Sequence, residues 1–153
     1  MNKQRRLILK TLMQGGMAVG ALVAAPGAAL AAWTEAAFTN KDMGQAMKNL
    51  LGSSDVTESD KVRLETPAIA ENGAVVPIKV SSSLPDVESI SIFVKNNPTP
   101  LVASFDIPPG TEPKVAVRIR MGKTSPVTAV VKAGGKLYSA TKETKVTIGG
   151  CGG

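Results

Sequence analysis

The chain has 153 residues, with 18 lysines and arginines, 12 aspartates and glutamates, no histidine and one cysteine. Because histidine is absent and cysteine occurs once, the chain cannot assemble a zinc, iron–sulfur or haem ligand set, nor a Ser–His or Cys–His catalytic pair. We therefore expect no metal, no cofactor and no enzyme activity of its own. The length suits one domain with a single core behind a targeting segment.

Residues 1–31 have the pattern of an export signal. Arg5-Arg6 lies in a basic head and precedes an apolar stretch, which is typical of the twin-arginine route. No residue from Thr11 to Ala32 is charged, and a run of this length can span a bilayer, so an uncleaved anchor is the alternative. The small residues around Ala31 favour cleavage after it, which predicts a periplasmic protein without stable membrane anchoring.

The export route and the charge balance bear on possible partners. Twin-arginine signals belong to proteins that cross the membrane already folded. Because no cofactor site is visible, we interpret the route as transport together with a bound partner subunit. The first 31 residues hold four of the 18 basic residues and none of the 12 acids, which leaves the rest of the chain with a net charge of +2. This small charge removes the main support for nucleic-acid binding.

Residues 32–61 predict a short helix followed by a polar linker. Asn40 or Thr39 can cap the helix, and Gly52 can end it. The linker covers Ser53 to Lys61. Apolar residues recur at helical spacing and predict ordinary packing against the body; they are Met43, Ala46, Met47, Leu50 and Leu51.

Residues 62–148 predict the folded body, an antiparallel β-sandwich. Apolar and polar residues alternate with a period of two, in about seven short strands separated by turns. Asn72-Gly73 and Gly134-Gly135 are signals for hairpin turns, and Pro77 indicates an edge strand or a bulge. No cysteine pair links the sheets. The predicted fold class is all-β and immunoglobulin-like in architecture, with a short N-terminal helix and a flexible C-terminal arm.

Two surface features are candidates for contacts with other molecules. Lys114, Arg118 and Arg120 alternate with the apolar residues of the clearest strand. Such a row either attracts an anionic substrate or acidic partner, or is simply the solvated face of the strand. The second feature is an additional apolar face, which suggests a partner. Its candidate interface residues are Phe93, Val75 and Val102.

Residues 149–153 form a carrier arm in our interpretation. They contain the only cysteine, Cys151, between two pairs of glycines: Gly149, Gly150, Gly152 and Gly153. Glycine loses more entropy on ordering than any other residue, so we expect this segment to stay mobile and to bring the thiol into narrow sites of other proteins. Cys151 is then the point of covalent substrate attachment. Two other roles remain open for a lone cysteine: burial as a small hydrophobic residue, and a disulfide to another chain.

The chain resembles the SoxY family, the sulfur-carrier subunits of the periplasmic thiosulfate-oxidising system. The resemblance covers nearly the whole chain. It comprises the twin-arginine start, the stretch Pro67–Gly73 leading to Val76-Pro77, the Asn97-Pro98 loop and the terminal Gly-Gly-Cys-Gly-Gly, which is the most specific element. The resemblance implies an immunoglobulin-like sandwich that forms a heterodimer with SoxZ, a partner without an export signal of its own.

The resemblance also implies the chemistry around Cys151. A c-type cytochrome couples thiosulfate to the cysteine, a hydrolase releases sulfate, and in some organisms a dehydrogenase oxidises the remaining sulfane sulfur. The expected function is thus a carrier that presents thiosulfate-derived intermediates to the Sox enzymes. The alternative is an exported structural or adhesion subunit that is joined to another chain through a disulfide at Cys151.

Overall fold

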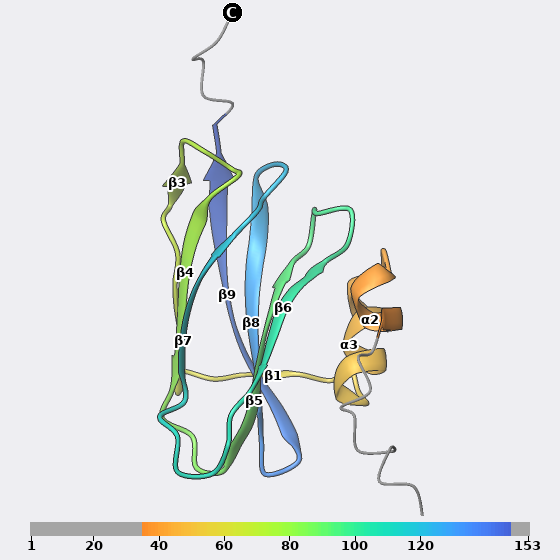
Figure 1. Ribbon diagram of the computed structural model, residues 1–153, viewed down its shortest axis with the longest axis vertical. Coiled ribbons are helices and arrows are strands. Elements are labelled where there is room, and N and C mark those ends of the chain that lie inside the picture. The colour runs from red at the N-terminus through yellow and green to blue at the C-terminus, as the bar shows by residue number, and fades with distance from the viewer. Residues whose placement is uncertain (1–34, 148–153) are drawn as a thin grey trace, which may run out of the picture. The chain divides into compact units, whose positions relative to one another are not determined.

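Two β-sheets pack face to face, and two short helices cover the outer face of the larger sheet (Figure 1). The computed structural model describes residues 35–147. The predicted signal, residues 1–31, and the predicted arm, residues 149–153, lie outside the described residues. None of the described helices is long and apolar enough to cross a membrane.

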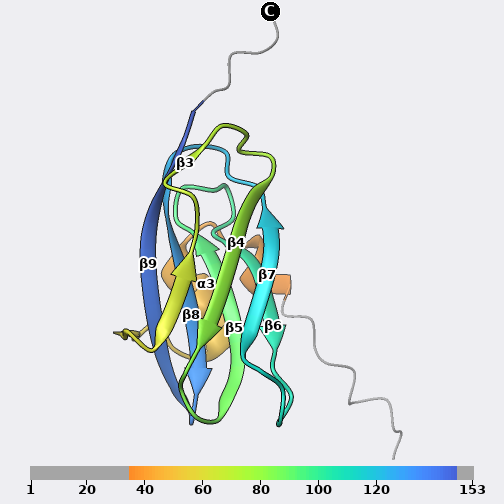
Figure 2. The same cartoon turned by 90° about the vertical axis from the view of Figure 1, so that its left-hand side faces the viewer.

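The larger sheet has six strands and the smaller sheet has three. In the larger sheet the order is β1-β9-β8-β5-β6, and β3 also pairs with β9. Its strands are β1 (Thr57–Glu58), β3 (Ile69–Ala70), β5 (Val87–Val94), β6 (Leu101–Asp106), β8 (Ser125–Ala133) and β9 (Lys136–Val146). The smaller sheet, in front in Figure 2, has the order β2-β4-β7. Its strands are β2 (Val62–Glu65), β4 (Val76–Ser82) and β7 (Lys114–Ile119).

The main core lies between the two sheets and follows the alternation of the strands. In β4, the buried residues Val76, Ile78 and Val80 alternate with the exposed Pro77 and Lys79. Burial of apolar surface is the main term that stabilises such a sandwich. The architecture confirms the predicted all-β sandwich. The larger sheet faces this core with Ile90, Ile92, Val94, Val127, Ala129 and Val131.

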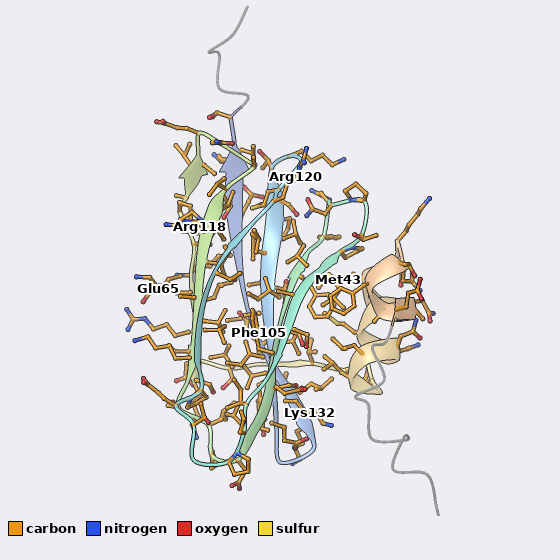
Figure 3. The ribbon with its side chains drawn as sticks, in the orientation of Figure 1. Met43, Glu65, Phe105, Arg118, Arg120 and Lys132 are labelled. Carbon is orange, nitrogen blue, oxygen red and sulfur yellow. The ribbon has the colours of Figure 1, made fainter. Side chains whose placement is uncertain are left out.

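A second core lies on the outer face of the larger sheet, covered by α2 (Glu35–Thr39) and α3 (Met43–Leu51). Phe93 belongs to this core and is 0% exposed. The prediction that Phe93 lies in an interface with a partner is therefore wrong, because the chain's own helices cover that face. Met43 packs against the same core from the helix side (Figure 3). The buried residues are Ala37, Ala46, Met47, Phe93, Leu101, Val130 and Leu137.

Helix α3 begins two or three residues later than the predicted caps, Asn40 and Thr39, suggest. The carboxylate of Asp42 accepts a hydrogen bond from the N–H of Gln45 at 2.8 Å, so Asp42 caps the helix, and neither Asn40 nor Thr39 does. Asn40 supports the cap, since its side-chain oxygen accepts from the N–H of Asp42 at 2.9 Å. Gly52 ends the helix as predicted, with a φ of 83°.

Of the two predicted hairpin turns, one joins paired strands. Gly134 and Gly135 have φ values of 55° and 72° and connect the antiparallel strands β8 and β9. Asn72-Gly73 also lies in a turn, in which the N–H of Val75 donates to the carbonyl of Asn72 at 3.2 Å. This turn, however, connects strands that do not pair with each other: β3 pairs with β9, whereas β4 pairs with β2 and β7. The hairpin prediction at Asn72-Gly73 is wrong.

Three smaller differences concern strand pairing. The predicted linker Ser53–Lys61 contains β1, which pairs with β9 in parallel orientation, and β3 pairs with β9 in the same orientation. The sandwich is therefore not purely antiparallel. Pro77 lies in the central strand of the smaller sheet, not in an edge strand. Because β2 ends opposite Lys79, Pro77 has a paired neighbour on one side only, Arg118 of β7. A residue without an N–H is tolerated at such a position.

Candidate functional site

The predicted attachment site, Cys151, lies outside the described residues, as do the predicted arm glycines Gly149, Gly150, Gly152 and Gly153. The structure describes the strand that leads to them. This strand is β9, and Thr147 is the last described residue after it (Figure 1). The strand end before the predicted carrier arm, which we call the base of the arm, is thus the part of the candidate site that the structure describes.

One side of this base is held by the short strand β3. The N–H of Lys145 donates to the carbonyl of Ala68 at 2.9 Å, and the N–H of Thr147 donates to the carbonyl of Ala70 at 3.1 Å. A two-residue strand contributes little by itself. Here it satisfies the backbone of β9 beyond the point where pairing with β8 stops, at Ser125 opposite Thr144.

The other side of the base is held by the hydroxyl of Thr124, and a pair of threonine hydroxyls lies just before it. The N–H of Val146 donates to Oγ1 of Thr124 at 3.0 Å. Oγ1 of Thr144, which is fully buried, lies 2.7 Å from Oγ1 of Thr66. Successive N–H groups of a strand point to opposite sides. Together with the bonds to β3, the bond to Thr124 therefore leaves three consecutive N–H groups satisfied, up to the last described residue.

Gly73 brings the turn before β4 against the end of β9. The N–H of Met121 donates to the carbonyl of Gly73 at 2.7 Å. A Cβ atom at position 73 would lie 2.4 Å from the carbonyl oxygen of Met121 and 2.9 Å from Cγ1 of Val146, which is closer than Cβ atoms approach in proteins. Glycine is thus required here for close approach of two backbone segments.

Two neighbouring asparagines connect the β5–β6 loop to the segment that carries Thr124. The amide of Asn97 donates to the carbonyl of Arg120 at 2.8 Å and accepts from the N–H of Gly122 at 3.1 Å. The amide of Asn96 donates to the carbonyl of Thr124 at 2.9 Å. An amide side chain can donate and accept hydrogen bonds at the same time, so it can take the place of both the N–H and the carbonyl of a neighbouring strand. Asn97 was predicted only as part of a loop that carries the family resemblance, and its role in this contact was not predicted.

The basic row of Lys114, Arg118 and Arg120 is exposed. Figure 3 shows Arg118 and Glu65 on the outer side of the smaller sheet. Arg63 of β2 is exposed as well, and its Nε lies 2.9 Å from Oε1 of Glu65. The exposure confirms that the row faces away from the core. A role in attracting an anionic substrate or partner stays a prediction.

The other two candidate interface residues differ from each other. Val102 is half-buried and packs against the main core, whereas Val75 is 49% exposed. Ile69, which the sequence analysis does not single out, is 58% exposed. The only sequence signal for Ile69 is a short apolar stretch between turns. Such a stretch is too short to predict which of its side chains is exposed.

An open cavity of about 600 Å³ lies between β6 and β7, the edge strands of the two sheets. Its lining includes Val102, Val117 and Asn97, and the only charged side chains in it are those of Arg118 and Arg120. It offers a binding surface without an acid–base pair or a nucleophile. Within residues 35–147, no three His, Cys, Asp or Glu side chains lie together where they could hold a metal ion.

Comparisons with known proteins identify the family. The family model described as sulfur oxidation protein SoxY matches residues 47–151. A solved structure, the sulfur carrier protein SoxY from Chlorobium limicola f thiosulfatophilum, is 48% identical, with a TM-score of 0.62, and the alignment covers 67% of this chain and 94% of that one. The sequence has no match among curated proteins.

A further solved structure, from work on T cell activation by toxic shock syndrome toxin-1, aligns with 10% identity and a TM-score of 0.41, covering 56% of this chain and 99% of that one. This likeness is too weak to carry an argument. The family match covers most of the chain, and the Chlorobium carrier aligns over nearly its full length. These two findings confirm the resemblance on which the sequence analysis relied. The chain belongs to the SoxY family of sulfur oxidation proteins.

Proposed function

We propose that this chain is a sulfur carrier that holds thiosulfate-derived intermediates covalently on Cys151 and presents them to separate enzymes. The observation that carries the proposal is the family match, which extends to residue 151, the position of the only cysteine in the sequence. The 48% identical relative from Chlorobium is a sulfur carrier protein. A carrier needs a thiol and no catalytic group of its own, in keeping with a sequence that lacks histidine.

The base of the arm supports this proposal. Hydrogen bonds hold β9 up to Thr147, and the sequence then continues through Ile148 to the glycines on either side of Cys151. A fixed starting point followed by residues with maximal backbone freedom lets a thiol adopt the different orientations that different active sites require. The arm glycines, Gly149, Gly150, Gly152 and Gly153, supply that freedom.

The chemistry on the arm has two balanced steps. The thiol of Cys151 and thiosulfate form a sulfur–sulfur bond, which gives a cysteine S-thiosulfonate, one proton and two electrons that a c-type cytochrome accepts. Water then attacks the terminal sulfonate sulfur, the sulfur–sulfur bond next to it breaks, sulfate and two protons leave, and Cys151 retains a persulfide anion. The thiolate is the nucleophilic and redox-active form of cysteine. The partner enzymes supply all other catalytic groups.

Family membership also supports the proposed partners and location. The carrier works as a heterodimer with SoxZ, and its enzymes are the Sox cytochrome, the sulfate-releasing hydrolase and, in some organisms, a sulfane dehydrogenase. Arg5-Arg6 directs export by the twin-arginine route with the partner bound, and cleavage after Ala31 leaves a periplasmic protein. Replacement of both arginines by lysine is then expected to retain both subunits in the cytoplasm.

An intact-mass measurement of the protein from the periplasm, with and without thiosulfate, tests the attachment directly. We expect sulfur or sulfonate adducts that a reducing agent removes. A non-reducing gel distinguishes the alternative function, because a structural or adhesion subunit would show a stable disulfide-linked partner and no adduct.

Cys151→Ser tests the role of the thiol. The variant keeps the size of the side chain and removes the only group that can bear sulfur. We expect thiosulfate-dependent cytochrome reduction to fall to background when the variant is the sole carrier, and the free energy of unfolding to change by less than about 0.5 kcal/mol. Substantial remaining electron transfer would overturn the carrier assignment.

A further inference from the structure

We propose that Ile69 and Val75 form an apolar docking surface at the base of the carrier arm, which contacts the entrance rim of the enzymes that receive Cys151. The inference rests on the proposed carrier function and specifies how those enzymes hold the body of the carrier. Among residues 35–147, three large hydrophobic side chains are exposed. Ile69 and Val75 are the two most exposed, at 58% and 49%, and the third is Val56 at 37%.

Both residues lie beside the last described part of β9. Ile69 is paired with Lys145 in the β3–β9 ladder, and the next residue, Ala70, accepts the hydrogen bond of Thr147. Val75 lies in the connection from β3 to β4, directly after the turn. Figures 1 and 2 both show this connection at the end of the sandwich where β9 ends. The two exposed residues thus belong to segments that lie beside the base of the arm.

The strand geometry explains why this surface is apolar in its centre and polar around it. Ala70 is buried, so Ile69, its neighbour in the strand, points away from the core. The surrounding residues Glu71, Asn72 and Lys145 are exposed and polar. An apolar centre with a polar rim is the usual composition of a protein–protein contact.

The reach of the arm places this surface in contact with any enzyme that buries the thiol. Cys151 lies four residues after Thr147, and four fully extended residues span at most about 14 Å. An enzyme that recesses its reacting atoms by a similar depth must bring its entrance against the residues around Thr147. The chemistry of the occupant follows: the rim of the entrance is apolar where it meets Ile69 and Val75.

The small size of the surface suits a carrier that moves between enzymes. Two partly exposed side chains provide far less area than a stable complex requires, so the contact is weak and transient. Weak docking raises the local concentration of the thiol at the entrance and still allows release. Its loss should raise the carrier concentration that an enzyme needs for half-maximal rate, and should leave the chemical step unchanged.

The double variant Ile69→Thr/Val75→Thr tests the surface. Threonine keeps the β-branched shape and replaces apolar groups by a hydroxyl. Val56→Thr is the matched control, since Val56 precedes β1, which pairs with Tyr138 and Ser139 near the opposite end of β9. Each carrier is assayed with its partner subunit in thiosulfate-dependent cytochrome reduction over a range of carrier concentrations. We expect the KM for the double variant to rise about tenfold, with kcat unchanged, and Val56→Thr to match the wild type.

Two further measurements separate docking from damage. The rate of Cys151 alkylation by iodoacetamide and the melting temperature should be equal in the three carriers. If the double variant does not fold, the single variant Val75→Thr, which changes no strand residue, takes its place. A wild-type KM in the variant, or a fall in kcat at unchanged KM, overturns the docking surface. A wild type that binds no sulfur from thiosulfate overturns the carrier function and the docking surface with it.

Discussion

The two ends of β9 are fixed in different ways. At Lys136 the strand starts from a two-residue turn, and its neighbour β8 is adjacent in the sequence. At Val146 the strand depends on residues far away in the sequence: Ala70 through β3, Gly73 through packing and Thr124 through its hydroxyl. The hairpin end also has distant partners, since β1 pairs with Tyr138 and Ser139 and Glu88 accepts from Gly135, but it has a local turn as well. The end that leads to the predicted carrier arm is held by the tertiary structure without such a turn.

This difference matters for the proposed function. A carrier arm needs a base that stays in place while the arm itself moves. Three consecutive N–H groups, at Lys145, Val146 and Thr147, are bonded to three separate acceptors. Ala68 and Ala70 belong to one segment and Thr124 to another, so a disturbance of either segment leaves the bonds to the other in place. The hairpin end, by contrast, has the local turn at Gly134-Gly135 in addition to its distant partners.

The same substitution at each end gives the largest predicted effect. Gly73→Ala should destabilise the fold by about 1–3 kcal/mol, because the added methyl group meets the carbonyl of Met121 and the side chain of Val146. Gly134→Ala should cost about 1 kcal/mol, since it meets no atom within 4 Å and only its φ of 55° is unfavourable for alanine. Urea unfolding of both variants measures the difference.

Amide hydrogen exchange then shows where each change acts. We expect faster exchange of the amides at 145–147 in Gly73→Ala and wild-type exchange there in Gly134→Ala. Equal exchange at the arm's base in both variants would contradict the view that Gly73 supports this end of β9.

Asn97→Ala gives a smaller effect at the arm's end. The substitution removes the hydrogen bonds to the carbonyl of Arg120 and from the N–H of Gly122, and should cost about 1 kcal/mol because both groups are open to water. Asn97→Asp is the control: it keeps the acceptor for Gly122 and loses the donor to Arg120. Thermal unfolding should rank the wild type as the most stable of the three. A stable Asn97→Ala variant would show that the asparagine does not connect the two sheets.

Sequence patterns predicted the parts of the fold that depend on near neighbours. The turn at Gly134-Gly135 was recognised because two glycines with positive φ are a local requirement, and Gly52 ends its helix for the same reason. Asn72-Gly73 is also a turn signal, yet the role of Gly73 is a close contact with Met121, 48 residues later. The sequence around Gly73 does not reveal this contact. The pairing of β3 with β9 was not predicted either, because the two strands are far apart in the sequence.

The burial of Phe93 shows a second limit. Alternation assigns alternate residues of β5 to opposite faces, and it does so correctly here. It does not say what covers each face. The helices α2 and α3 cover the outer face, so that Phe93 is buried by the chain itself and not by a partner. The arm residues, by contrast, were predicted from residue types alone. Glycines have no side chains to pack, so the prediction for Cys151 and its glycines did not depend on contacts with distant residues.

The smallest predicted effect concerns the hairpin end, where Glu88 accepts from the N–H of Gly135 at 2.9 Å and lies 3.1 Å from Nζ of Lys132. Lys132 lies near the hairpin that joins β8 and β9 (Figure 3). The hydrogen bond from Gly135, followed by the bond from Lys132, lowers the pKa of Glu88 below its ordinary value of 4.5. A carboxyl with a lowered pKa in the folded state stabilises the fold above its unfolded pKa, and this contribution is lost as the pH falls through the folded value.

Glu88→Gln keeps an acceptor for Gly135 and removes the charge. We expect the variant to be slightly less stable than the wild type at neutral pH, since exposed ion pairs contribute little, and the difference to shrink as the pH falls below 4.5. Urea midpoints at pH 7 and pH 3 measure it, and high salt at pH 7 should reduce it by screening. Amide exchange at 145–147 should not change, because Glu88 acts at the opposite end of β9. A difference in stability that grows towards low pH, or faster exchange at the arm's base, would contradict the separation of the two ends.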